Sequence, residues 1–262
     1  MSLPIAGKII LFIVFKLILI YPYLRDMLIG HDFPKMEFQL FGLDLLEPNA
    51  LIWNWVLSFL AFYFAYKIYK EEPRQSFTYY WTGFFLLFGT GLFFGGLGHS
   101  LWNYWGAEGK IIPFSLSIIS IYLMERGMIC LHQSSRIRTA LILGSKIKLV
   151  AALIILGVVF LTVDVQSNLP KGFAVPGINA TLGLLFSLLF LPLYYRSKGY
   201  GNFQYFLWSV AVLLPSTIFQ LLKINLHPWM DRNDVAHILM LLAFIFYYQG
   251  IKKYNQKIND YS

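Results

Sequence analysis

The side chains in this sequence best suited to chemistry are two histidines that lie at the ends of long apolar runs. His99 closes the glycine-rich stretch GLFFGGLGHS, and His237 lies near the start of the stretch NDVAHILML. Asp234 precedes His237 by three residues, so both side chains share one face of a helix, a spacing that holds metal ions in helical bundles. Two imidazoles, a carboxylate and a water molecule would form an open zinc site, which lowers the pKa of the water and polarises a carbonyl group. We therefore predict that His99, His237 and Asp234 ligate a metal ion, with zinc as the cofactor.

A structural interpretation of the same residues stays open beside this one. Asn233 or Asp234 can cap the helix that begins there, because their side chains accept hydrogen bonds from unpaired backbone N–H groups. Both histidines can also hydrogen-bond to polar neighbours with no ion present. Haem ligation is a further alternative, since two histidines on facing helices can serve as axial ligands.

The composition places the chain in a lipid bilayer. Hydrophobic residues make up 58% of the chain and charged residues 13%, and the mean hydropathy is +0.61. An ordinary soluble domain is about half apolar and about a quarter charged. A membrane-spanning helix needs roughly 20 mainly apolar residues, and seven runs meet this need. These runs cover residues 49–69, 79–102, 112–131, 148–165, 176–195, 204–222 and 235–251.

A weaker run covers residues 5–23. Lys8 and Lys16 lie inside it, and a lysine near the bilayer centre is costly unless it reaches the surface or finds a partner. We predict that this run also spans the membrane. The expected fold is therefore all-α, with a bundle of seven core transmembrane helices in residues 49–262. An N-terminal helix and a connection along the outer membrane surface precede the bundle in residues 1–48.

Basic residues concentrate on one side of the predicted spans. Twelve lysines and arginines fall on the side that holds the C-terminus, and six fall on the other side. Cytoplasmic loops are enriched in these residues, so we predict a cytoplasmic C-terminus and an outer location for His99 and His237. The alternation of basic residues with the spans also accounts for the net charge of +8, so we expect no nucleic-acid partner. The twelve are Lys67, Lys70, Arg74, Arg136, Arg138, Lys146, Lys148, Arg196, Lys198, Lys252, Lys253 and Lys257.

Small residues mark one face of the second predicted span as a packing face. Gly91, Gly95 and Gly98 stand at i, i+4 and i+7, and His99 follows Gly95 by four residues. Helices in lipid pack closely where small residues let their backbones approach. We therefore expect His99 to point into the bundle. Because the chain reverses direction at each span, His237 should lie at a similar depth near the same membrane face.

Other features narrow the classes of function. The sequence contains no GxSxG elbow, Walker A run, HExxH or CxxC motif, so nothing in it indicates an ATPase, a serine hydrolase or a familiar metalloprotease. The two halves of the sequence show no corresponding pair of interrupted apolar segments, which would be typical of a transporter. We interpret Glu125 and Arg126 as part of an ion cluster near the inner interface.

Two short motifs carry a resemblance to a known superfamily. Gly95 to Ser100 reads GGLGHS and Asn233 to His237 reads NDVAH. With seven core helices, they resemble the CREST superfamily of membrane hydrolases and receptors, which includes alkaline ceramidases and the progestin and adipoQ receptors. The chain also looks like uncharacterised bacterial seven-helix families grouped near them, which implies a bacterial inner membrane.

The resemblance implies a zinc site with one histidine from the second helix and two from an HxxxH motif in the seventh. It also implies a serine four residues before the first histidine, and an aspartate nearby. His99 and His237 match this pattern, whereas Gly95 and Asn233 stand where the serine and the other histidine would be. Ser100 and Asp234 are the residues we expect to compensate as catalytic groups.

The resulting expectation is a multi-pass membrane protein with a metal-dependent hydrolase-like site that acts on a lipid amide or ester. The alternative is a non-catalytic membrane protein that binds a lipid, a pigment or a partner helix. The 24 Phe, 17 Tyr and 7 Trp residues motivate this alternative. Membrane lipid is the expected partner in both cases, with a helix-mediated partner or a second copy of the chain as a further contact.

Overall fold

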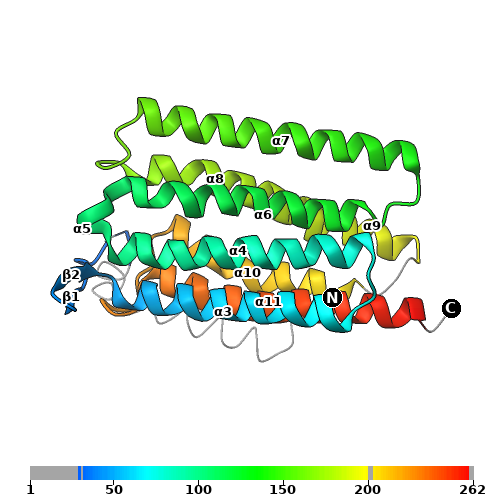
Figure 1. Cartoon of the computed structure of the whole chain (residues 1–262), viewed down its shortest axis with the longest axis horizontal. Helices are drawn as coiled ribbons and strands as arrows, with labels where there is room; N and C mark the ends of the chain where they lie inside the picture. The colour runs from blue at the N-terminus through cyan, green and yellow to red at the C-terminus, as the bar shows by residue number, and fades with distance from the viewer. Residues whose placement is uncertain (1–28, 31, 200–202, 260–262) are drawn as a thin grey trace.

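The protein is an integral, multi-pass membrane protein with an all-α fold (Figure 1). The computed structural model describes residues 29–30, 32–199 and 203–259, so the predicted helix at 5–23 lies outside the described residues. Within the described part, seven helices are long and apolar enough to cross a membrane. They are α3 (Pro48–Glu71), α4 (Ser76–Ser100), α5 to α6 (Trp102–Ile129), α7 (Ser135–Thr162), α8 to α9 (Leu169–Ser197), α10 (Gln204–Leu221) and α11 (Arg232–Asn259).

Two of these spans contain short irregular pieces. The third consists of α5 (Trp102–Trp105), the 3₁₀-helix η1 (Gly106–Lys110) and α6 (Ile111–Ile129). The fifth consists of α8 (Leu169–Leu184), the π-helix η2 (Leu185–Phe190) and α9 (Leu191–Ser197). π-Helical turns inside α-helices are rare and often accompany functional sites.

Each predicted span overlaps one of the seven helices, but three of them begin well before the predicted residue: the third at Trp102, the fifth at Leu169 and, with the largest difference, α7. We placed the start of α7 at residue 148, and the helix begins at Ser135. Ser134 caps it by accepting a hydrogen bond from the backbone N of Ile137 at 3.4 Å. The prediction was wrong because it assigned Lys146 and Lys148 to a loop on account of their charge, whereas Lys148 has a buried carboxylate partner on α6.

The connection before α3 forms a β-hairpin, which the sequence patterns did not predict. Strands β1 (Glu37–Leu40) and β2 (Leu43–Leu46) pair antiparallel, with Leu40 opposite Leu43. Phe41 and Gly42 form the turn with φ of 52° and 76°, and positive φ at both positions is the geometry of a type I′ hairpin turn. Figure 1 shows the hairpin at one end of the bundle, beside α5. We call this the hairpin end, and the opposite end the C-terminal end.

The core of the bundle is an aromatic layer. Trp81 and Phe85 of α4 are fully buried. The ring of Trp81 stacks on that of Phe206 of α10 at 5.4 Å, and the ring of Phe85 meets that of Phe244 of α11 edge-on at 5.5 Å. These contacts join helices that are distant in sequence and hold α4 against α10 and α11.

The predicted glycine face of α4 is confirmed. Gly91, Gly95 and Gly98 are all buried. A Cβ atom on Gly91 would lie 3.2 Å from the Cβ of Leu116, and one on Gly95 would lie 3.2 Å from the Oδ1 of Asn54. The small residues therefore let α3 and α6 approach α4 closely.

Helix α7 lies at one side of the bundle, as Figure 1 shows. It packs against α6 and α8. Its exposed side chains include Ile147, Val150, Ile154, Val158 and Leu161. An exposed stripe of this kind is suited to contact with lipid tails, which makes membrane lipid a partner of the protein.

Candidate functional site

The hairpin end brings together four ionisable side chains from four elements. Glu47 immediately precedes α3, His99 lies in the last turn of α4, Lys110 ends η1 and His237 lies in the second turn of α11. The structure therefore places the two predicted histidines at the same end of the bundle. It adds Glu47 and Lys110, which no sequence pattern had singled out.

The closest contact in this cluster joins Glu47 and His99. The Oε2 of Glu47 lies 2.6 Å from the Nδ1 of His99. Burial raises the pKa of Glu47, but the hydrogen bond with His99 and the charges of His99 and Lys35 outweigh it and lower that pKa to about 2. Glu47 is therefore an anion at neutral pH, and a carboxylate can only accept hydrogen bonds. The Nδ1 of His99 must carry the proton, so in the neutral ring Nε2 is left as the basic nitrogen.

The local backbone aims Glu47 at α4. Glu47 has φ of 52° and ψ of 62°, in the left-handed region, which is unfavourable for a residue with a side chain and more so before a proline such as Pro48. The hairpin holds this conformation, because the backbone N of Glu47 donates a hydrogen bond to the backbone O of Met36 at 2.8 Å. Strained backbone that the surrounding structure maintains is characteristic of functional sites.

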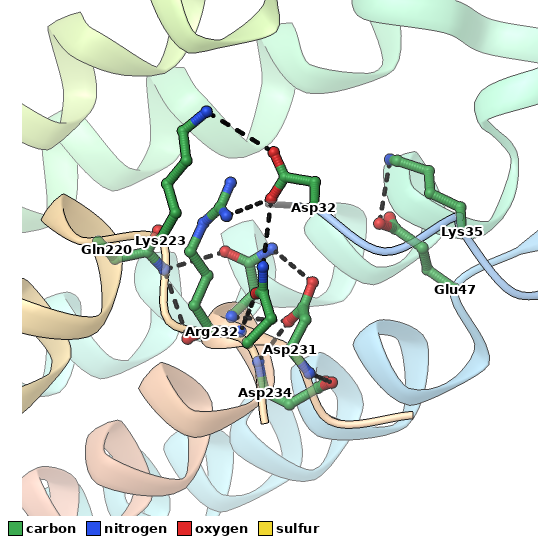
Figure 2. A network of polar contacts seen from close by, with 10 residues as sticks. Asp32, Lys35, Glu47, Gln220, Lys223, Asp231, Arg232 and Asp234 are labelled. Atoms are coloured by element: carbon green, nitrogen blue, oxygen red, sulfur yellow. Dashed lines mark hydrogen bonds and ion pairs between the residues drawn. The ribbon is translucent and has the colours of Figure 1, made fainter. Parts of the chain in front are cut away.

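The other oxygen of Glu47 is occupied by Lys35, as Figure 2 shows. The Nζ of Lys35 lies 3.0 Å from the Oε1 of Glu47 and 5.5 Å from the ring centre of Trp102. Both carboxylate oxygens of Glu47 therefore already have cationic or N–H partners.

Lys110 has no such partner. Its residue is only 3% exposed, and its Nζ makes no hydrogen bond to any described residue. Its amine interacts electrostatically with Glu47, His99 and His237. An isolated buried ammonium group is unfavourable by several kcal/mol, so its presence calls for an explanation.

Two further polar atoms near this end also lack partners among the described residues. They are the Oγ of Ser100 and the Nδ1 of His237, both buried, and the ring of His237 is otherwise contacted by the backbone of Asn233. His99 also lies within electrostatic range of His237. Hydrogen-bonding groups that stay unsatisfied inside a bundle indicate a ligand, a water molecule or an ion.

Asp234 has a defined structural role at the start of α11. Its Oδ2 accepts a hydrogen bond from the backbone N of Asp231 at 3.0 Å. In return, the Oδ1 of Asp231 accepts from the backbone N of Asn233 at 2.7 Å and from that of Asp234 at 3.0 Å. This reciprocal pattern is a capping box. Asp231 is therefore the capping side chain, where the sequence analysis named Asn233 or Asp234.

A polar network extends this cap (Figure 2). Arg232 forms an ion pair with Asp32, and its backbone N donates to the Oδ1 of Asn225 at 3.0 Å. Gln220 of α10 donates to the Oδ1 of Asn233 at 3.0 Å. These contacts fix the turn between α10 and α11 and, with it, the position of His237.

The arrangement of side chains does not fit the predicted three-ligand metal site. Across the described residues, no group of three or more His, Cys, Asp or Glu side chains is arranged to hold a metal ion. The Nδ1 of His99 is bonded to Glu47, and the carboxylate of Asp234 belongs to the helix cap. The Lys110 ammonium near both histidines would also repel a cation. Zinc ligation by His99, His237 and Asp234 stays a prediction for metal analysis.

A second buried ionic group lies between α6, α7 and α8. The Oε1 of Glu125 lies 2.6 Å from the Nζ of Lys148, which also donates to the Oδ1 of Asn179 at 2.9 Å. Arg126 points elsewhere, because it donates to the hydroxyl groups of Tyr80 and Tyr122. The ion cluster expected around Glu125 and Arg126 is thus two separate sets of contacts.

The comparisons with known proteins give a family without an assigned activity. A model of a family of unknown function (DUF6962) matches residues 50–256. No curated protein matches the chain. The resemblance to the CREST superfamily therefore stays a prediction. Since the match covers most of the sequence, including His99, Lys110 and His237, the chain belongs to this family of unknown function, DUF6962.

Proposed function

We propose that the protein hydrolyses an ester or amide bond of a membrane lipid at the hairpin end, with His99 as the general base and Glu47 as its orienting carboxylate. The observation that carries this proposal is the 2.6 Å contact between the Oε2 of Glu47 and the Nδ1 of His99. A carboxylate that holds one ring nitrogen of a histidine fixes its tautomer and directs the other nitrogen at a substrate.

The chemistry follows from this orientation. The Nε2 of His99 accepts a proton from a water molecule, whose oxygen then attacks the carbonyl carbon of the lipid. His99 returns the proton to the leaving alcohol or amine, and Glu47 stabilises the imidazolium that forms in between. Asp234 acts as a positioning residue, because it completes the cap of the helix that carries His237. Ser100, adjacent to His99, remains a candidate catalytic group because its buried hydroxyl is unpaired among the described residues.

An outer location of this site belongs to the proposal. The C-terminal end keeps an excess of basic residues after Lys146 and Lys148 are reassigned to α7, which supports a cytoplasmic C-terminus, here in a bacterial inner membrane. A cysteine introduced at Gln133, in a Cys130→Ser background, should react with a membrane-impermeant reagent only after the membrane is opened. Reaction in intact cells would show that the orientation is the opposite of the one proposed.

The direct test uses the full chain in proteoliposomes. The substrates are a phosphatidylcholine and an N-acyl sphingolipid, and released fatty acid is measured by mass spectrometry. We expect release by the wild type and at least about a hundredfold slower release by His99→Gln and Glu47→Gln, since general bases contribute about 10²–10⁴-fold. His227→Gln is the matched control, because His227 is an exposed histidine at the same end. Equal rates in His99→Gln and wild type would contradict the proposal.

Lipid binding without catalysis is the second candidate function, and the unpartnered Lys110 favours it. It predicts copurifying lipid and no release from any substrate by the wild type.

Elemental analysis of the same preparations tests the zinc prediction. About one zinc per chain, lost in both His99→Ala and His237→Ala, would bear it out.

A further inference from the structure

Lys110, at the end of η1, is a buried lysine whose amine has no partner among the described residues. Its residue is 3% exposed, and its Nζ makes no hydrogen bond within the described part of the chain. The three N–H groups of an ammonium each need an acceptor when they leave water. An arrangement that omits all three acceptors is stable only if something else supplies them.

Glu47 does not supply them. Its carboxylate interacts electrostatically with Lys110. However, its Oε2 is hydrogen-bonded to His99 and its Oε1 forms an ion pair with Lys35. The negative charge of Glu47 is thus already matched by the positive charge of Lys35. Lys110 is left without a carboxylate of its own among the described residues, so an anion that binds beside it would stabilise its ammonium form.

The backbone holds Lys110 in place. A Cβ atom on Gly98 would lie 2.6 Å from the backbone O of Gly109 and 3.5 Å from the Cδ of Lys110. Only a glycine at position 98 lets η1 approach α4 this closely. The start of η1 is also fixed, because the backbone N of Ala107 donates to the Oε1 of Gln166 at 2.7 Å. The Lys110 stem therefore lies against the last turn of α4, which carries His99.

We propose that Lys110 binds the oxyanion of a lipid, either a fatty-acid carboxylate or a phosphate, beside His99 and His237. The inference rests on the proposed function for the identity of the site, and it names the substrate class as lipids with a negatively charged group. The buried ring of His237, which the backbone of Asn233 contacts, is the second group that could donate to the same anion. A charge-assisted hydrogen bond of this kind is strong and specific for oxyanions.

The test compares charged and neutral probes of equal length. Dissociation constants of oleate and oleyl alcohol, and of dioleoyl phosphatidate and dioleoylglycerol, are measured by titration calorimetry of the full chain in non-ionic detergent. We expect the wild type to bind at least one charged probe about tenfold or more tightly than its neutral partner. Preference for oleate would identify a fatty-acid carboxylate, and preference for phosphatidate a lipid phosphate.

Variants separate Lys110 from other lysines. Lys110→Met keeps an unbranched side chain that lacks the terminal amine and should abolish the preference, whereas Lys110→Arg should retain most of it. Lys223→Met is the matched control, because Lys223 is an exposed lysine at the same end of the bundle. Equal affinity of the wild type for charged and neutral probes, or an unchanged preference in a folded Lys110→Met, would overturn the proposal.

The failure of this inference can be distinguished from failure of the proposed function. His99→Gln should lose fatty-acid release and keep the preference for the charged probe, because it removes the base and leaves the ammonium. If the wild type releases fatty acid but shows no preference for a charged probe, hydrolysis stands and the oxyanion site is wrong. If the preference is present and no lipid is hydrolysed, the oxyanion site stands and the proposed hydrolysis is wrong.

Discussion

Lys110 and Lys148 are both lysines set among membrane-spanning helices, but their surroundings differ. Lys148 has a carboxylate at 2.6 Å and an amide oxygen at 2.9 Å, from Glu125 and Asn179. Lys110 has neither within the described residues, although it is the more deeply buried. The bundle thus places a carboxylate beside one buried lysine, whereas among the described residues it places none beside the other at the hairpin end. The paired lysine joins helices, and the unpaired one is available to a ligand.

The largest effect is expected from removing the partner of Lys148. Glu125→Leu leaves an uncompensated cation between α6 and α7, so it should destabilise the protein by about 3–5 kcal/mol. It leaves Lys148 with the oxygen atoms of Asn179 as its remaining partners and with no carboxylate to match its charge. Thermal unfolding in detergent measures the loss. The double variant Glu125→Leu with Lys148→Met should recover most of it, and a double variant as unstable as Glu125→Leu would refute the pairing.

The charge of Glu47 gives the hairpin end a pH-dependent stability. The pKa of Glu47 is about 2 in the folded protein, against an ordinary value of 4.5. A folded-state pKa below the unfolded one stabilises the folded protein above pH 4.5, and the contribution is lost as pH falls towards 2. On the order of 2–3 kcal/mol should disappear across this window. Melting curves of the wild type and Glu47→Gln measure it, and parallel curves for the two would contradict the ionised carboxylate.

The close approach of η1 to α4 can be broken at one residue. A Cβ atom in Gly98→Ala would meet the backbone O of Gly109 at 2.6 Å, so the backbone must move. We expect a loss of about 1–3 kcal/mol of stability and weaker binding of the charged lipid probe, because Lys110 moves with η1. Gly144→Ala is the control, since a Cβ there would meet nothing within 4 Å. Unchanged probe affinity in Gly98→Ala would show that ligand binding by Lys110 does not depend on this contact.

The smallest effect is expected at the cap of α11. Asp234→Asn weakens the hydrogen bond to the backbone N of Asp231 and should cost about 0.5–1 kcal/mol. Neither lysine is involved, so the preference for the charged probe should persist. Metal content measured on the same variant sharpens the result. Loss of a stoichiometric zinc ion would show that Asp234 is a ligand as well as a cap residue.

Much of the fold follows from local sequence patterns. Hydropathy and length locate the spans, and the spacing of Gly91, Gly95 and Gly98 locates the packing face and the inward direction of His99. These features depend on neighbours along one helix, which a sequence displays directly. The wrong start of α7 has the opposite origin, because Lys148 is compatible with a helix only through Glu125, far away in the chain.

The site was only half predictable for the same reason. His99 and His237 are conspicuous because histidines are rare within apolar runs. Glu47 is separated from His99 by 52 residues, and its orientation depends on a hairpin and a left-handed backbone conformation. A glutamate directly before Pro48, at the start of an apolar helix, is the signal that could have identified it. The burial of Lys110 depends on Gly98 of another helix, a contact that the residues next to Lys110 in the sequence do not reveal.

The most direct test of a ligand-binding role for Lys110 is the melting temperature of the wild type and of Lys110→Met, each with and without saturating oleate. Without ligand, we expect Lys110→Met to melt at a higher temperature than the wild type, because it removes an unpaired buried charge. With oleate at about 100 times its dissociation constant, the wild type should gain about 2.7 kcal/mol and the variant much less. A variant that is less stable without oleate, and gains as much as the wild type with it, would contradict the role assigned to Lys110.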